Sequence, residues 1–497
     1  YTQTVTMILS RNRVATFLLF FLVAGGLLVH LYFGTSPAPT PDPGGSKQQD
    51  PCRQRLGRLK DLDVKFPIQY ARRDINVVYI SGMQRPSVTS VDEPLFPKVQ
   101  IVDPGKDPIL EHCMPPLSLE VSSLPKKETL DASNVLFAMS TLLGRLEDSI
   151  PFLERWLAHT GADIFVLVVT SEEDRKPDRK KMAQLQSHMR DLGIKATLVG
   201  PLDENDDMAH RYFSLVKLLY SKRDKGTQWL GIVDDDTFFP SMHSLITMLG
   251  NYDPRQQQYV GGMSEEWWSV VLYGLMAFGG AGLFLSLPMA ALIDSNYQAC
   301  REQSGSSAGD MRIQECIQWH SPVRLTPIPT LHQMDMGGDL SGVYESGWNP
   351  LSLHHWKSDW WDDKRPDRWF PLHVMHLVAD VCADCFLQRW RFGDDTVLSN
   401  GFSIATYPKG ISDAELGKPE HTWLGPRTVP DTFNPGYVHS FGEIREPLKL
   451  EEEKMQYMFL DAELVDGGVR QYYLHRGLGD EMDTLVELVW IGQGEGS

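Results

Sequence analysis

Apolar and polar positions alternate in a regular order from Asn134 to about residue 236. Apolar positions three and four residues apart predict helices between short apolar runs that predict buried strands. The strands are expected over residues 135–139, 164–169, 196–199 and 229–233. Alternating strands and helices predict an α/β fold whose sheet is covered on both faces and binds ligands at the carboxyl ends of its strands.

Three helices are expected between these strands. The first should begin at Asp148-Ser149-Ile150-Pro151, because a polar cap followed by proline is typical of a helix start. The others are a polar helix over residues 180–192 and an amphipathic helix over residues 208–219. The strand over residues 229–233 ends in three aspartates, which places them where ligands are expected.

The N-terminal part contains one long apolar stretch, residues 14–33, without Asp, Glu, Lys or Arg. About 20 apolar residues are what a helix needs to cross a bilayer, so we expect a membrane anchor after a cytosolic tail of residues 1–13. A cleaved signal peptide is the alternative, but its apolar core is typically shorter. Arg11 and Arg13 before the span predict a type II orientation, with the rest of the chain in a lumen.

The remaining boundaries follow changes in composition. Residues 34–51 are rich in Pro, Gly, Ser and Thr and predict a flexible stem. Residues 52–130 contain short strand-like runs among many prolines and are expected to be an irregular extension. The catalytic domain is expected over residues 131–408, followed by an acidic but folded C-terminal appendage over residues 409–497.

Charge and cysteine content narrow the function. The chain has 47 Lys plus Arg and 65 Asp plus Glu, a net charge of −18, which disfavours nucleic-acid binding. Six cysteines fit an oxidising compartment but are too few to be the framework of a domain this large. Cys382-x-x-Cys385 has no second pair to complete a zinc site, so a local disulfide or free thiols are expected.

Asp234, Asp235 and Asp236 are the strongest chemical feature, since they follow a buried strand. Carboxylate oxygens in this position could hold Mg²⁺ or Mn²⁺ against a diphosphate, and a cation would relieve their mutual repulsion. A helix-capping acidic loop is the alternative.

Three further elements follow along the chain. Gly279, Gly280 and Gly282 allow the backbone to pass close to a ligand or to another segment, although an ordinary turn would explain them too. Asp310 begins an amphipathic helix, where a carboxylate is favoured and could simply cap it. His354-His355 follows a strand-like segment, and such a pair is more often a surface or core feature than a ligand.

These elements, in this order, resemble the Fringe-like β1,3-glycosyltransferases, a group that includes Fringe and core 1 galactosyltransferase. The resemblance runs from about Asn134 to His355 and is closest to the plant and fungal branch. The blocks that carry it are Ile232-Val-Asp-Asp-Asp-Thr-Phe238, Gly261-Gly-Met-Ser-Glu265, Gly279-Gly-Ala-Gly282, Arg312-Ile-Gln-Glu-Cys316, His332-Gln-Met-Asp335 and Ser352-Leu-His-His355.

The resemblance implies a GT-A type fold, with a Rossmann-like mixed sheet flanked by helices, a UDP-sugar donor and a glycan or glycoprotein acceptor. It also implies Mn²⁺ or Mg²⁺, inversion at the anomeric carbon, and residence in the Golgi membrane, with the endoplasmic reticulum second. The metal ligands carried over are Asp236 and His355, with His354 as the alternate and Asp234 beside them. Asp310 matches the family's catalytic base.

Several residues keep two interpretations. Ser140 and Thr141, at the end of the first strand, could touch the nucleotide together with Asp234, Asp235 and the glycines, or could cap a helix. Trp267 and Trp268 could form a sugar-binding wall or pack in the core.

Cys300 and Cys316 flank the loop before the Asp310 helix, so we expect them to be paired and to position that residue. A lumenal lectin-like or scaffold protein that has lost turnover is the alternative function, and calcium-stabilised adhesion is a third.

Overall fold

The computed structural model describes residues 59, 61–96, 98–103, 114–122, 130–169, 178–356, 370–424, 442–448 and 452–492. The predicted cytosolic tail, anchor and stem lie outside these residues, as do Cys52 and Cys113. In the described ranges, no helix is both long and apolar enough to cross a membrane. The N-terminal anchor therefore stays a prediction from sequence.

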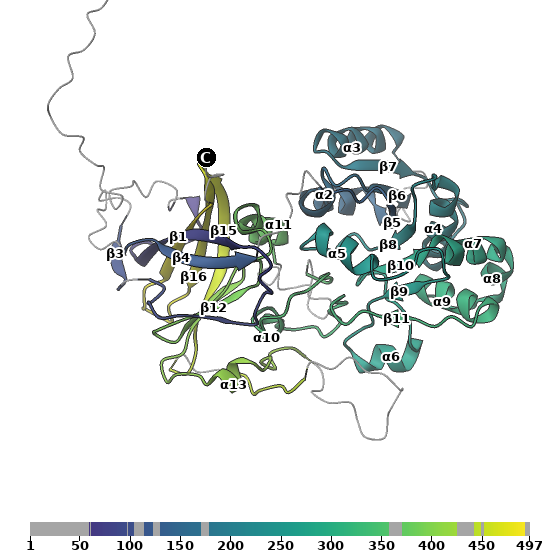
Figure 1. Ribbon diagram of the computed structural model, residues 1–497. Helices are drawn as coiled ribbons and strands as arrows, with labels where there is room; N and C mark the ends of the chain where they lie inside the picture. The colour runs from purple at the N-terminus through teal and green to yellow at the C-terminus, as the bar shows by residue number, and fades with distance from the viewer. Residues whose placement is uncertain are drawn as a thin grey trace, which may run out of the picture. The chain divides into compact units, whose positions relative to one another are not determined.

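A seven-stranded mixed sheet forms the part of the chain that carries the aspartates (Figure 1). Its spatial order is β11-β9-β10-β8-β5-β6-β7. Strands β5 to β8 are parallel, whereas β10 runs antiparallel between β8 and β9. The strands are β5 (Val135–Leu142), β6 (Asp163–Val169), β7 (Lys195–Val199), β8 (Trp229–Ile232), β9 (Tyr259–Gly261), β10 (Leu283–Ser286) and β11 (Thr326–Pro327). The predicted α/β class and the four predicted strands are confirmed.

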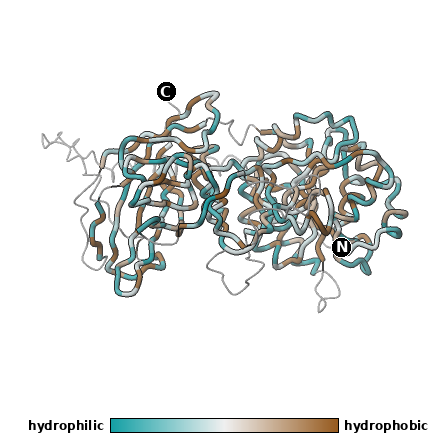
Figure 2. Tube along the Cα trace, turned by 90° about the horizontal axis from the view of Figure 1, so that it is seen from below, coloured by the Kyte–Doolittle hydropathy of each residue, from teal (hydrophilic) through white to brown (hydrophobic). Residues whose placement is uncertain are grey.

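Helices cover both faces of this sheet. Successive side chains of β5 point to opposite sides and pack against different helices. Phe137 packs in one apolar cluster with Trp156, whereas the neighbouring Leu136 packs in another with Phe213. Figure 2 shows hydrophobic segments running through the interior of the trace. The helices are α2 (Leu143–Leu157), α3 (Arg179–Asp191), α4 (Met208–Lys222), α5 (Met242–Leu249), α6 (Trp267–Tyr273), α7 (Leu287–Ser295), α8 (Tyr297–Gln303) and α9 (Gly309–His320).

The predicted start of the first helix was wrong. Helix α2 begins at Leu143, and Pro151 lies inside it. The first turns are held by a tertiary contact, since Arg145 pairs with Asp235 and the Ser149 hydroxyl donates to the Asp235 carbonyl at 2.8 Å. The local pattern of cap and proline could not reveal a partner about 90 residues away.

A second sheet, of ten strands, combines the two ends of the described chain. Its order is β2-β12-β13-β14-β15-β16-β17-β1-β3, with β4 paired to β1. The strands are β1 (Ile68–Ile80), β2 (Thr89–Val91), β3 (Gln100–Val102), β4 (Leu117–Ser122), β12 (Arg389–Phe392), β13 (Thr396–Ser399), β14 (Ser403–Thr406), β15 (Met455–Val465), β16 (Gly468–His475) and β17 (Thr484–Ile491). The short helices α10 (Ser341–Tyr344), α11 (Leu372–Met375), η6 (His376–Val378, a 3₁₀ helix), α12 (Ala379–Cys382) and α13 (Asp413–Leu416) complete the described elements.

The strands of this sheet come from both sides of the expected domain boundaries. Strand β1, inside the segment expected to be irregular, pairs in parallel with β17 of the C-terminal appendage, and Ile75 lies opposite Trp490. Strands β12 to β14 belong to the same sheet although they precede residue 408, so the expected boundary there does not separate the two sheets. Pairing between strands some 400 residues apart leaves no local signal.

Candidate active site

The three aspartates lie at the carboxyl end of β8, where the sequence placed them. The backbone N–H of Val233 donates to the Ala138 carbonyl at 3.0 Å and holds the strand end against β5. The Thr237 hydroxyl accepts a hydrogen bond from the Asp234 N–H and donates to the Gly280 carbonyl, both at 2.9 Å. One side chain thus ties the aspartate turn to the glycine turn.

Asp235 has a positioning role in this structure. The guanidinium of Arg145 binds its carboxylate, with Nε 2.6 Å from Oδ2, and the Thr141 hydroxyl donates to the same oxygen. These contacts attach the start of α2 to the aspartate turn. Ser140 is half-buried in the same strand and, because side chains alternate along a strand, points away from Thr141 and Asp235.

His354 faces the other two aspartates. Phe238 and Leu353 exchange two backbone hydrogen bonds of 2.8 Å, which bring the histidine beside the turn. The Nε2 atom of His354 lies 3.0 Å from Asp236 Oδ1 and 3.4 Å from Asp234 Oδ2. Its Nδ1 lies 3.0 Å from the Gln333 carbonyl oxygen, which can only accept, so Nδ1 carries a proton and Nε2 faces the carboxylates.

The electrostatics of this group are strongly coupled. Burial lowers the pKa of His354, but the charges of Asp236 and Asp234 outweigh burial and raise it well above its usual value. Burial likewise raises the pKa of Asp236, and the positive charge of His354 more than reverses this, so that pKa is lowered. A proton on Nε2 therefore holds the group together.

Within the part of the chain that the structure describes, no group of three or more His, Cys, Asp or Glu side chains is arranged as a metal site. The donor set of Asp234, Asp236 and His354 nevertheless has suitable chemistry, since carboxylate oxygens and an imidazole nitrogen bind Mn²⁺ or Mg²⁺. The bond from Nδ1 to a backbone carbonyl is the usual support of a metal-binding histidine. These residues fit a divalent cation in place of the proton.

His355, the first-choice metal ligand from sequence, lies beside His354, with the two ring centroids 3.9 Å apart. Its Nδ1 lies 3.4 Å from Asp335 Oδ1, and its backbone has a φ of 52°. Burial and the nearby charge of His354 lower the pKa of His355 to about 3. Burial raises the pKa of Asp335 to about 7, although the Ser264 hydroxyl donates to it at 2.5 Å. The structure thus brings the alternate, His354, to the aspartates.

The glycines make room for site residues. A Cβ added to Gly280 would lie 2.2 Å from His354 Cε1, and a Cβ added to Gly279 would lie 1.4 Å from Tyr212 Oη. Gly282 has a φ of +104°, which side chains disfavour, and its N–H closes the turn onto the Gly279 carbonyl at 2.8 Å. The glycine turn is therefore packed directly against the site, and its predicted contact with a nucleotide stays a prediction.

Asp310 lies at the first turn of α9. Its carboxylate accepts hydrogen bonds from the Met311 N–H, at 2.9 Å, and from the Gly279 N–H. Burial and then the charge of Asp234 raise its pKa to about 6, against these hydrogen bonds. A carboxylate with this pKa is suited to accept a proton near neutral pH.

The expected disulfide between Cys300 and Cys316 is confirmed and joins α8 to α9. Arg312 Nη1 also donates to the Ser304 carbonyl at 2.9 Å, so the loop before Asp310 is held at two points. Cys382 and Cys385 form the local disulfide that was one of two expected states.

The tryptophan pair belongs to α6. The two indole rings of Trp267 and Trp268 are stacked with centroids 4.3 Å apart, and Trp268 is 54% exposed. Core packing therefore does not explain Trp268, and its role as a sugar-binding wall stays a prediction.

Three site residues were missed from sequence. Gln333 lies in one of the blocks that carry the resemblance, and its side-chain oxygen accepts from the Ala281 N–H at 2.8 Å. Arg145 and Tyr212 lie on helices with ordinary periodicity and have partners far away in sequence. No local signal could have identified those two.

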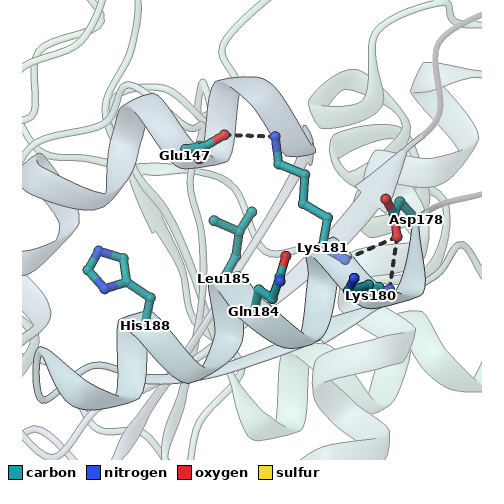
Figure 3. A pocket seen from close by; sticks show the side chains of 7 residues that line it. All are labelled: Glu147, Asp178, Lys180, Lys181, Gln184, Leu185 and His188. Carbon is teal, nitrogen blue, oxygen red and sulfur yellow. Dashed lines mark hydrogen bonds and ion pairs between the residues drawn. The ribbon is translucent and has the colours of Figure 1, made fainter.

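A cavity of about 470 Å³ lies between α2 and α3 (Figure 3). Glu147 and Lys181 form an ion pair of 2.7 Å across it, and Asp178 caps α3 by accepting from the Lys180 and Lys181 N–H groups. None of the site residues that the sequence predicts lines this cavity. Its lining carries charges of both signs.

Residues 270–428 match the family described as "Protein of unknown function, DUF604". This segment contains the glycine turn, Asp310 and both histidines. No curated protein sequence matches the chain.

Similar solved structures are glycosyltransferases. They include the mannosyltransferase PcManGT of Pyrobaculum calidifontis in complex with GDP-Man and Mn²⁺, with 12% identity, a TM-score of 0.28, and coverage of 45% of this chain and 63% of that one. Another is GlyE of Streptococcus pneumoniae TIGR4, with 13% identity, a TM-score of 0.31, and coverage of 49% and 60%. A third is mouse xyloside xylosyltransferase 1, with 12% identity, a TM-score of 0.26, and coverage of 39% of this chain and 84% of that one. The chain spans about three fifths of the first two.

Proposed function

We propose that this chain is a GT-A type glycosyltransferase that moves a sugar from a UDP-sugar to a hydroxyl of a glycan or glycoprotein, with a β1,3 linkage. The observation that supports this best is that the site carboxylates form two sets with different partners. Asp234 and Asp236 converge on His354, whereas Asp310 lies on α9 and is bonded by other groups. One group suits a cation and diphosphate, and the other suits proton transfer.

The residues have separate tasks in this reaction. Asp234, Asp236 and His354 would hold Mn²⁺ or Mg²⁺, which when bound supplies positive charge to stabilise the departing diphosphate. Asp310 accepts the proton of the acceptor hydroxyl while that oxygen attacks C1 of the donor sugar. The bond from C1 to the diphosphate breaks as the new bond forms, so a single displacement inverts the anomeric carbon.

Other residues organise the site. Arg145 neutralises Asp235 and leaves the two flanking carboxylates to the cation. Trp268 offers an exposed aromatic face against which a pyranose could stack. Residence in the Golgi membrane as a type II protein remains part of the proposal and depends on residues 11–33 and on the resemblance.

A donor screen with the full chain tests this function. UDP-galactose, UDP-GlcNAc and UDP-glucose are each incubated with and without Mn²⁺, and released UDP is measured with acceptor glycans present. Asp236→Asn is the matched control, since it removes one charge at nearly constant volume. Mn²⁺-dependent UDP release by the parent and none by the variant is expected. Sugar binding without transfer would instead support the lectin-like alternative.

A further inference from the structure

Tyr212 lies between the two carboxylate groups of the site. Its Oη is 1.4 Å from the position that a Cβ on Gly279 would occupy, and the same position is 3.5 Å from Asp234 Oδ1. A Cβ on Gly309 would lie 2.3 to 2.7 Å from Tyr212 Cβ, Cγ and Cδ1. The tyrosine is therefore in close contact with the backbone at both glycines.

Both contacts lead to Asp310. Gly309 precedes this residue in the chain and is the first residue of α9. Gly279 supplies the N–H that donates to the Asp310 carboxylate. One aromatic ring thus supports the two backbone elements that determine where the carboxylate stands.

The hydroxyl of Tyr212 is an unused hydrogen-bond donor. Its oxygen is buried and has no partner among the residues that the structure describes. An unpaired buried hydroxyl is costly, so such a group is expected to serve a neighbour that carries charge. Asp234 and Asp310 are the carboxylates whose charges act on it most strongly.

We propose that Tyr212 is a positioning residue for Asp310: its ring fixes Gly279 and Gly309, and its hydroxyl, unpaired in the described structure, donates to the Asp310 carboxylate when donor and acceptor are bound. This rests on the proposed function, in which Asp310 is the base.

The test is a double-mutant cycle in the full chain, with kcat and donor KM measured by UDP release. Tyr212→Phe keeps the ring and should lower kcat about 3- to 10-fold, the worth of one hydrogen bond, with donor KM unchanged. Tyr212→Leu removes the aromatic plane and should lower kcat further. In an Asp310→Asn background neither change should lower kcat again, because the group being positioned is gone. Tyr220→Phe, on the same helix, is the matched control and should have the parental kcat.

Equal fold losses in the parent and in the Asp310→Asn background, or parental kcat in both Tyr212 variants, would overturn this inference. Thermal unfolding of every variant separates a loss of folded protein from a loss of turnover. Failure of the proposed function looks different, since Asp310→Asn would then itself have the parental rate.

Discussion

Asp310 gives the sharpest prediction, because its pKa and its role are linked. Burial and the charge of Asp234 raise its pKa to about 6. A base with this pKa is about nine-tenths protonated at pH 5, so transfer should fall about tenfold per pH unit below 6 and level off above it. Bound Mn²⁺ would offset the charge of Asp234, so the midpoint should move to lower pH as Mn²⁺ is raised.

The same raised pKa has the opposite effect on folding. The folded protein holds the Asp310 proton more tightly than the unfolded chain does. The stability this contributes is fully present below the usual pKa of 3.8 and is lost as the pH rises through 6. Asp310→Asn cannot ionise, so at pH 7 it should be more stable than the parent, by about 1–3 kcal/mol. Its transfer rate should fall by about 10²–10⁴.

Two measurements check this prediction. UDP release is followed from pH 4.5 to 8 at saturating donor and at several Mn²⁺ concentrations, and urea unfolding of parent and variant is compared at pH 7. A parental rate for Asp310→Asn would refute its role as base. A variant less stable than the parent at pH 7 would refute the electrostatic reasoning, because burial of the charge would then not be unfavourable.

The remaining predictions concern the histidines and a buried ion cluster. His354→Gln should abolish Mn²⁺-dependent donor binding in calorimetry, because its Nε2 faces both aspartates, whereas His355→Gln should retain most of it; the reverse order would contradict the assignment. Lys454 Nζ lies 2.7 Å from Glu345 and 2.8 Å from Glu420, and all three side chains are buried. Lys454→Met leaves the two carboxylates without their cation, so it should lower the free energy of unfolding in urea by about 3–5 kcal/mol. A decrease below about 1 kcal/mol would contradict this prediction.

The limits of sequence reasoning are clearest at the two histidines. Two adjacent histidines in a motif are nearly equal candidates for a metal ligand, and the resemblance favoured His355. The backbone pairing of Phe238 with Leu353 fixes the register that places His354 Nε2 3.0 Å from Asp236, whereas His355 Nδ1 lies 3.4 Å from Asp335. Register and backbone direction are tertiary properties that residue order does not display.

The sequence by itself determined the features that local physics controls. Apolar runs identified the strands β5 to β8, and a polar run after a buried strand placed the three aspartates at its carboxyl end. Cysteine spacing around the Asp310 loop indicated the Cys300–Cys316 pair. Each of these follows from burial or chain proximity within a short window.

Only the tertiary structure decided which distant groups meet. Three contacts join segments far apart in the chain. Strand β1 pairs with β17, Arg145 forms an ion pair with Asp235, and Tyr212 packs against Gly279 and Gly309. Such contacts depend on packing, in which a residue's partner is chosen by shape and charge rather than by sequence distance. The place of the three aspartates could therefore be anticipated from sequence, whereas their supporting contacts could not.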